Sequence, residues 1–139
     1  MTRRVFVDTS AWVAVVDSSD SHHSEAAETY ARLLKSPVTF VTTILVVAET
    51  QVWLRRRTGA EAASAFLKNA NESQRIEIVY PNARLEAEAK RILRQYEDQD
   101  FRLADAISFA FMRQNGLTEA FAYDRHFATA GFTFSGETL

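Results

Sequence analysis

The stretch "RVFVDTSAWVAVV" (residues 4–16) joins two apolar runs through a single acid, Asp8. The first run is rich in β-branched and aromatic residues, as short buried strands are. The second run, "TSAWVAVV", has the composition of a short helix that begins behind a Ser or Thr cap. These residues therefore predict a strand, a tight turn and a helix, with Asp8 at the carboxyl end of the strand.

Strands and helices alternate along the rest of the chain. Further strands are expected at "VTFVT" (38–42), "IEIVYP" (76–81), "EAFAYD" (119–124) and "FTF" (132–134). The segments between them have helical spacing of apolar residues, among them 24–36, 43–57 and 102–115. Because parallel strands need crossovers, which are usually helices, we predict an α/β fold with a mainly parallel sheet of about five strands. No linker-like stretch divides residues 1–139, so one domain is expected.

Composition narrows the possible functions. The absence of cysteine excludes disulfides, thiolate nucleophiles and cysteine-ligated zinc, and it suits a reducing cytoplasm. A formal charge of −2 gives no overall basic field for nucleic acid. Asp8 interrupts the amino-terminal apolar run, which argues against a signal peptide, and no segment is long enough to span a membrane. A soluble, cytoplasmic protein is expected.

The helix around Glu49 places this acid among apolar residues. Its neighbours at the spacing of one helical stripe are Leu45, Ala48, Val52 and Trp53. If that stripe faces the core, the Glu49 carboxylate needs a partner, because a buried unpaired charge is costly. Three explanations are open: an ion pair with an Arg from another element, a side chain that extends to solvent at the edge of the stripe, or a cation that Glu49 shares with other acids.

Three further acids stand where neutral groups are expected. Asp8 and Asp124 each end an apolar strand, and open parallel sheets bind ligands outside the carboxyl ends of their strands. Asp105 is the one acid of a helix that is apolar around nearly its whole circumference. For each acid alone, helix capping or the helix dipole is the alternative explanation. Together with Glu49, a shared divalent cation would explain all of them.

Such a cluster of like charges would raise the pKa values of its members and repel itself, whereas Mg²⁺ or Mn²⁺ would relieve the repulsion through hard oxygen ligands. One or two such ions can clamp a phosphodiester and lower the pKa of a bound water. The acids therefore predict hydrolysis of a phosphodiester.

Four segments carrying these acids resemble the PIN-domain family, and within it the VapC-type toxins of toxin-antitoxin pairs. The segments are "VFVDTSAW" (5–12), "VVAET" (46–50), "RLADAISFAFMRQNG" (102–116) and "FAYDRHFATAGF" (121–132). Each is short, but their order, spacing and expected secondary structure are specific together. The resemblance covers nearly the whole chain.

The resemblance implies a metal-dependent endoribonuclease with a Rossmann-like α/β/α fold and an acidic pocket formed by Asp8, Glu49, Asp105 and Asp124. Asp8 and Asp105 are the expected metal ligands. Asp124 would complete this site or a second one, and Glu49 would bind metal or orient the attacking water. The hydroxyl of Ser10 would steady Asp8 or a metal-bound water, with helix capping as the alternative. The resemblance also implies a homodimer silenced by a small VapB-type antitoxin whose tail enters the pocket.

The chain departs from the family pattern at two alanines. Many relatives have a hydroxyl residue at the position of Ala104, directly before the third acid, and at that of Ala122, two residues before the fourth. These departures leave an alternative open, which is a weakly active or inactive PIN-like module that binds RNA or protein. Two other α/β classes fit less well. A receiver domain needs adjacent acids after its first strand, and a phosphatase of the haloacid dehalogenase type needs an Asp where Ser10 stands.

Several other side chains are weighed for function. Arg102 and Arg125 lie near the presumed site, three residues before Asp105 and directly after Asp124, and are expected to contact RNA phosphates. The arginines 55–57 could do the same, although the dipole of their helix also favours a basic carboxyl end. His126 has no second imidazole at metal-ligand spacing, so a surface or structural role is expected. Trp53 is expected in the core.

Overall fold

The structure, a computed structural model, describes residues 3–136 and contains a five-stranded sheet in the order β3-β2-β1-β4-β5. Every neighbouring pair in this sheet is parallel. The predicted α/β fold with about five strands is therefore confirmed. Within residues 3–136, no helix is both long enough and apolar enough to cross a membrane.

The elements follow the alternation that the sequence predicts. The strands are β1 (Arg3–Val7), β2 (Val38–Thr43), β3 (Ile76–Val79), β4 (Glu119–Phe121) and β5 (Thr133–Phe134). The helices are α1 (Thr9–Val16), α2 (His23–Leu34), α3 (Ile44–Thr58), α4 (Ala60–Glu72), α5 (Ala83–Gln95), α6 (Leu103–Gln114) and α7 (His126–Thr129).

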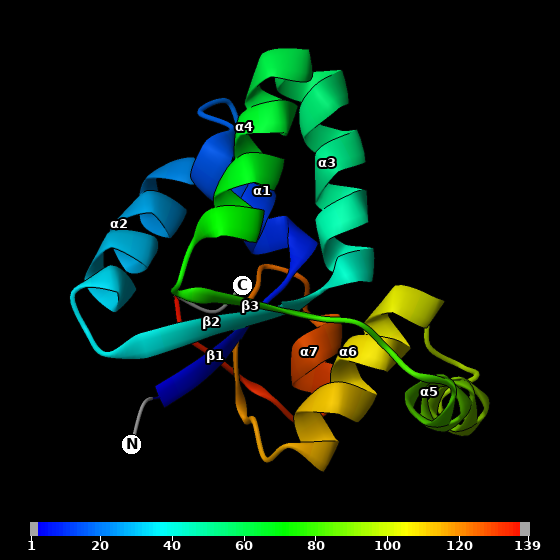
Figure 1. The fold of residues 1–139 in the computed structure, drawn as a ribbon. Coiled ribbons are helices and arrows are strands. Elements are labelled where there is room, and N and C mark those ends of the chain that lie inside the picture. Colours follow the sequence, from blue (N-terminus) through cyan, green and yellow to red (C-terminus); the bar gives the residue numbers. More distant parts are fainter. Residues whose placement is uncertain (1–2, 137–139) are drawn as a thin grey trace.

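The helices cover the sheet from both sides. Figure 1 shows α1 to α4 on one side of the strands and α5 to α7 on the other, which gives three layers. Both faces of the sheet are therefore buried. The largest fully buried side chains include Phe6, Phe40, Phe109, Phe121 and Phe127. This explains why the central strands read as continuous apolar runs rather than as alternating ones.

The chain reverses its direction of travel across the sheet between β1 and β4. From β1 it proceeds outward through β2 to β3, and it then returns to the other side of β1 to form β4 and β5. Val7 pairs with Phe121 at this boundary, and the backbone N–H of Asp8 continues the ladder to the carbonyl of Phe121 (3.1 Å). Such a switch point opens a crevice at the carboxyl ends of the strands, where ligands of α/β proteins bind.

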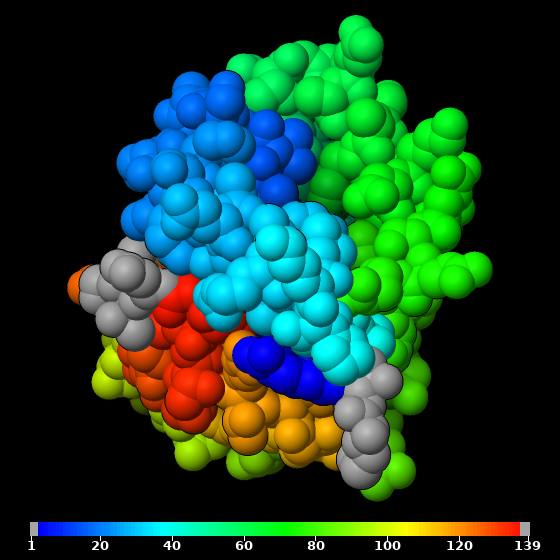
Figure 2. Space-filling view, turned by 90° about the vertical axis from the view of Figure 1, so that its left-hand side faces the viewer, coloured from blue at the N-terminus to red at the C-terminus, as the bar shows by residue number. Residues whose placement is uncertain are grey.

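A second hollow lies on the side of the molecule that carries α2. Figure 2 looks at this side and shows α1 at the bottom of a depression between α2 and α4. The depression has a volume of about 310 Å³ and an apolar lining that includes Trp12, Tyr30 and Phe66. In the same view α2 lies beside the segment that follows β5, where Arg32 donates a hydrogen bond to the carbonyl of Ser135 (3.3 Å).

The prediction of which face of α3 lies against the core is wrong. The buried residues of this helix are Val46, Val47, Thr50 and Leu54. Val52 and Trp53, which the sequence placed in the core together with Glu49, are 43% and 39% exposed. The apolar residues of α3 thus occupy two faces, and Glu49 lies on the face that points away from the core.

Candidate active site

Asp8 lies directly after β1 and caps the amino end of α1. Its side chain is 6% exposed and accepts hydrogen bonds from the backbone N–H of Ser10 (3.3 Å) and from the Ser10 hydroxyl (2.9 Å). Burial, followed by the nearby charges of Asp105 and Asp124, raises the pKa of Asp8 from 3.8 to about 7, although the Ser10 hydrogen bonds act in the opposite direction. Both explanations considered from sequence, the cap and the acidic cluster, apply to this residue.

Asp105 comes from the other side of the sheet, in the first turn of α6. One of its carboxylate oxygens accepts a hydrogen bond from the backbone N–H of Arg102 (2.9 Å), as the acid of a capping box does. The residue is 5% exposed, and burial together with the charge of Asp124 raises its pKa. A helix cap does not require the capping acid to be buried beside another acid. The hydrogen bond from Arg102 therefore does not explain why Asp105 is buried near Asp124.

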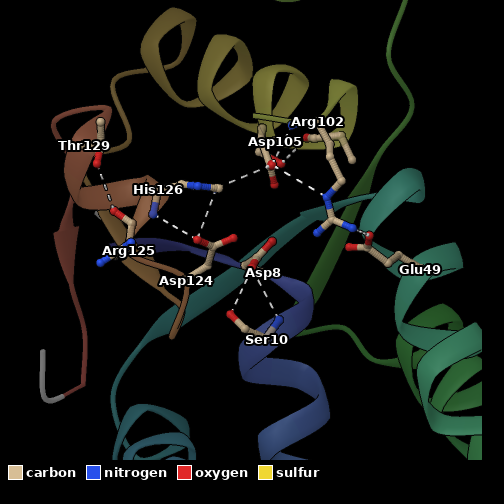
Figure 3. A network of polar contacts seen from close by, with 11 residues as sticks. Asp8, Ser10, Glu49, Arg102, Asp105, Asp124, Arg125, His126 and Thr129 are labelled. Atoms are coloured by element: carbon tan, nitrogen blue, oxygen red, sulfur yellow. Dashed lines mark hydrogen bonds and ion pairs between the residues drawn. The ribbon is translucent and has the colours of Figure 1, made fainter. Parts of the chain in front are cut away.

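Asp124 lies in the loop that follows β4, three residues beyond the end of the strand at Phe121. Its carboxylate accepts a hydrogen bond from the backbone N–H of His126 (2.9 Å), which fixes the turn into α7. Figure 3 shows Asp8, Asp105 and Asp124 facing one central space. Asp8 and Asp124 follow the strands β1 and β4, whereas Asp105 belongs to α6, which lies on the other side of the sheet from α1. The structure therefore brings together three of the four acids selected from the sequence.

The fourth acid, Glu49, lies to one side of these three acids. Its carboxylate pairs with the guanidinium of Arg102 (2.9 Å), and Figure 3 shows Arg102 reaching from α6 to Glu49 on α3. The side chain of Glu49 is 25% exposed, and its partner is an Arg from another element, which is one of the alternatives that the sequence left open. Arg102 itself is largely exposed, and so is Arg125.

The side chain of His126 also lies beside the acids, a position that the sequence analysis did not predict. Its Nδ1 lies 3.4 Å from an oxygen of Asp124 and 3.9 Å from an oxygen of Asp105. This nitrogen is buried and has no hydrogen-bond partner within residues 3–136, and the ring packs edge-on against Phe101. The expectation of a surface or structural role overlooked a signal in "DRHF": a His two residues after an acid in a tight turn can return its ring to that acid.

These groups fit a divalent cation. One ligand atom each from Asp105, Asp124 and His126 can be chosen so that all three lie within 4.8 Å of one another, and the buried carboxylate of Asp8 faces the same space. Carboxylate oxygens suit Mg²⁺ and Mn²⁺, and imidazole is a further ligand for transition metals. A cation would also give the unpartnered Nδ1 of His126 a partner.

Ser10 connects two of the acids. Its hydroxyl donates to Asp8 and accepts a hydrogen bond from the backbone N–H of Tyr123 (2.9 Å), the residue before Asp124. The loop that carries Asp124 is therefore tied through Ser10 to the turn that carries Asp8.

The variant Ser10→Ala is expected to lower the free energy of unfolding by about 1–3 kcal/mol, because the N–H of Tyr123 loses its acceptor. Urea unfolding at neutral pH measures this change. Ser10→Thr keeps the hydroxyl and serves as the control, which should lose less. Equal stability of Ser10→Ala and the unaltered protein would contradict the assigned hydrogen bonds.

The cavity over the acids has a volume of about 270 Å³. It extends from Asp8 and Asp124 past Glu49 and Arg102 toward the loop between α1 and α2. Of the predicted catalytic acids, Asp8, Glu49 and Asp124 line it. Fold, switch point and acids together define a parallel α/β protein with a carboxylate site open to solvent on one side.

The family model of the PIN domain matches residues 5–133, and the chain belongs to this family. It is similar to the 23S rRNA-specific endonuclease VapC20 of Mycobacterium tuberculosis, with 34% identity over 128 residues that cover 92% of this chain and 95% of the relative. The recognition of a VapC-type PIN protein from the four sequence segments is confirmed.

Solved structures agree with this assignment. The crystal structure of Mycobacterium tuberculosis VapC20, described as a sarcin-ricin loop cleaving toxin, has a TM-score of 0.85 and 33% identity over 93% of this chain and 96% of that chain. VapBC2 from Rickettsia felis, solved bound to a promoter DNA fragment, has a TM-score of 0.68 and 15% identity over 94% of this chain and 96% of that chain. The second likeness, at this identity, concerns the fold alone.

Proposed function

We propose that the protein is a metal-dependent endoribonuclease and the toxin of a VapBC-type pair. The observation that carries the proposal is the convergence of Asp8, Asp105 and Asp124 at the switch point of the sheet. Burial raises the pKa of Asp8 to about 7, so the grouping of these acids is unfavourable while the site is empty. A purely structural role would not require such an unfavourable grouping.

Asp8, Asp105 and Asp124 would hold one or two Mg²⁺ or Mn²⁺ ions, with His126 as an additional ligand. When bound, such a cation activates water and stabilises the charge that develops on the phosphodiester. The protein's own contribution is to fix the carboxylates: Asp8 through Ser10, Asp105 through the backbone of Arg102, and Asp124 through the backbone of His126.

Glu49 and Arg102 act at the border of the acidic cluster. The ion pair holds the Arg102 guanidinium beside the cavity, where it is exposed and can contact an RNA phosphate. Glu49 therefore positions Arg102 in this proposal, and a further role in orienting the attacking water is compatible with its place in the cavity lining. Arg125, exposed beside Asp124, is proposed as a second phosphate contact.

The proposed substrate is RNA, and ribosomal RNA is the first to test, since the relative VapC20 is a 23S rRNA-specific endonuclease. A VapB-type antitoxin is proposed as the partner, because the similar VapC20 is described as a toxin. A single nuclease domain, a homodimer and a cytoplasmic location complete the proposal.

The decisive experiment is sequencing of RNA 5′ ends in cells after induction of the protein and of its Asp105→Asn variant. Asparagine can still accept the hydrogen bond from the Arg102 N–H, so the cap of α6 is kept while the charge is removed. We expect new ends at one or a few positions with the unaltered protein, and their loss with Asp105→Asn.

Identical ends from both proteins would exclude Asp105 from the reaction and contradict the proposed site. RNA that the purified protein binds but does not cleave, with Mg²⁺ or Mn²⁺ present, would instead support an inactive PIN-like binding module. Ala104 and Ala122 would then be the first positions at which to restore a hydroxyl.

A further inference from the structure

An acid, an aromatic ring and a base succeed one another along one face of α3. Glu49, Trp53 and Arg57 are spaced by four residues and all three line the cavity over the active site. The indole of Trp53 is 39% exposed, so its contacts in the folded chain leave much of its surface free. An exposed tryptophan beside a carboxylate site is not explained by the core, where the sequence had placed it.

The conformation of this ring is fixed from one side by Arg57. The guanidinium lies over the indole, 5.3 Å from the ring centre, and is itself paired with Asp17 (3.4 Å) and Asp20 (3.5 Å). These ion pairs hold Arg57 against Trp53 and limit the rotamers of both side chains. The aromatic surface is thereby organised before any ligand binds.

A second aromatic surface lines the same cavity. The imidazole of His22 stacks on the ring of Tyr123 with ring centres 4.3 Å apart and an angle of 12° between the planes. Tyr123 is anchored through its hydroxyl, which donates a hydrogen bond to Glu25, and it directly precedes Asp124. A flat ligand in the cavity can therefore contact aromatic rings contributed by α3 and by the loop after β4.

The charges of the cavity restrict what can bind there. Asp8, Asp20, Glu49 and Asp124 are among its lining residues, and Arg57 and Arg102 pair with two of these acids, so an anionic group is favoured only beside the arginines or beside a cation that the acids would hold. A neutral, planar group can occupy the aromatic part without repulsion from these acids. An unpaired nucleobase is such a group, and its own phosphate would lie toward the acids and the cation.

We propose that Trp53 and the His22–Tyr123 pair form a binding site for one unstacked nucleobase next to the cleaved phosphodiester. This inference rests on the proposed ribonuclease function and specifies its substrate as an unpaired RNA segment. In a duplex the bases are stacked on one another, so they cannot reach the indole. Loops and bulges can turn a base outward, which is how most sequence-specific RNA-binding proteins gain access to bases.

The test uses the Asp105→Asn protein without added metal, so that RNA can bind but is not cleaved. The chain has two tryptophans, and Trp12 is 2% exposed, so a ligand in the cavity should quench the fluorescence of Trp53 alone. We expect quenching by an unstructured RNA oligonucleotide and none by the same sequence in a duplex.

In the same background, Trp53→Ala should raise the Kd for single-stranded RNA by about 5- to 150-fold. This range corresponds to the loss of stacking of one base on an aromatic side chain. Trp53→Phe should retain most of the affinity. Leu67→Ala is the matched control, because Leu67 on α4 is equally exposed, at 39%, but does not line the cavity. Its Kd should not change.

The inference would be overturned if Trp53→Ala bound single-stranded RNA as tightly as Leu67→Ala, or if duplex RNA quenched equally well. Quenching by an arginine-containing peptide but not by RNA would also overturn it and would assign the cavity to a protein partner. These failures leave cleavage by the unaltered protein intact. Failure of the ribonuclease function itself would appear separately, as absence of metal-dependent cleavage by the unaltered protein.

Discussion

Asp8→Asn is expected to stabilise the metal-free protein at pH 8 while it removes a group that the proposed reaction requires. Burial and the charges of two neighbouring acids raise the pKa of Asp8 from 3.8 to about 7. The ionised form, which is present at pH 8, is therefore the unfavourable form in the folded protein. Asparagine keeps the size, the cap and the hydrogen bonds from Ser10 but carries no charge.

The sign of the pH dependence follows from the same difference. Between pH 4 and pH 7 the folded protein holds a proton on Asp8 that the unfolded chain has already released, so stability falls as the pH rises through this range. The raised pKa of Asp105 acts in the same direction. The loss from Asp8 can reach about 4 kcal/mol at pH 8.

Urea unfolding in EDTA at pH 4.5 and pH 8 measures this prediction. The two proteins should have similar stability at pH 4.5, and Asp8→Asn should be the more stable one at pH 8. Asp17→Asn is the contrasting control, because Asp17 is also buried, but hydrogen bonds from Ser19 lower its pKa. That variant should be destabilised at pH 8. A destabilised Asp8→Asn protein at pH 8 would contradict the assigned environment of Asp8.

Addition of Mn²⁺ is expected to offset most of the destabilisation of the unaltered protein at pH 8, because the metal stabilises this protein and not Asp8→Asn. A cation that binds only the folded state stabilises it by about 2.7 kcal/mol at a concentration of 100 times its Kd. The unaltered protein should show this gain, and the variants Asp8→Asn and Asp105→Asn should lose most of it. The temperature of unfolding over a series of Mn²⁺ concentrations is the measurement.

Two further variants make the Mn²⁺ prediction specific. Glu49→Gln should retain most of the gain, because Glu49 is paired with Arg102 and lies to the side of the three acids. Asp20→Asn removes an acid of the same cavity whose carboxylate pairs with Arg57, and it should retain the full gain. An equal gain in all variants would show nonspecific binding of Mn²⁺ to the acidic surface.

The fold could be predicted because each strand is a short apolar run and each crossover carries its own helical spacing. The carboxyl ends of parallel strands meet at one edge, so Asp8 and Asp124 could be expected together before any coordinates were known. Asp105 was recognisable because a charge stands out on a helix that is apolar nearly all round.

The orientation of α3 could not be predicted from spacing alone. Its true core face, with Val46 and Leu54, and its solvent face, with Val52 and Trp53, are both apolar. Periodicity identifies a core face when the opposite face is polar, and here it is not. The exposed apolar residues of α3 beside the active site are the reason for this ambiguity.

Contacts between side chains of distant elements could also not be predicted from the sequence. The Arg102 guanidinium could have reached several acids, and its pairing with Glu49 depends on how close α6 and α3 lie. The place of His126 depends on the turn after Asp124, which is set by a hydrogen bond from the backbone of His126 itself.

The central claim, that acids from separate elements share one cation, is tested most directly by anomalous diffraction from crystals grown with Mn²⁺. The expected result is a peak in the space between Asp8, Asp105 and Asp124, at about 2.2 Å from their nearest carboxylate oxygens. Crystals saturated with Mn²⁺ that show no peak in this space, or a peak only at other surface acids, would contradict it.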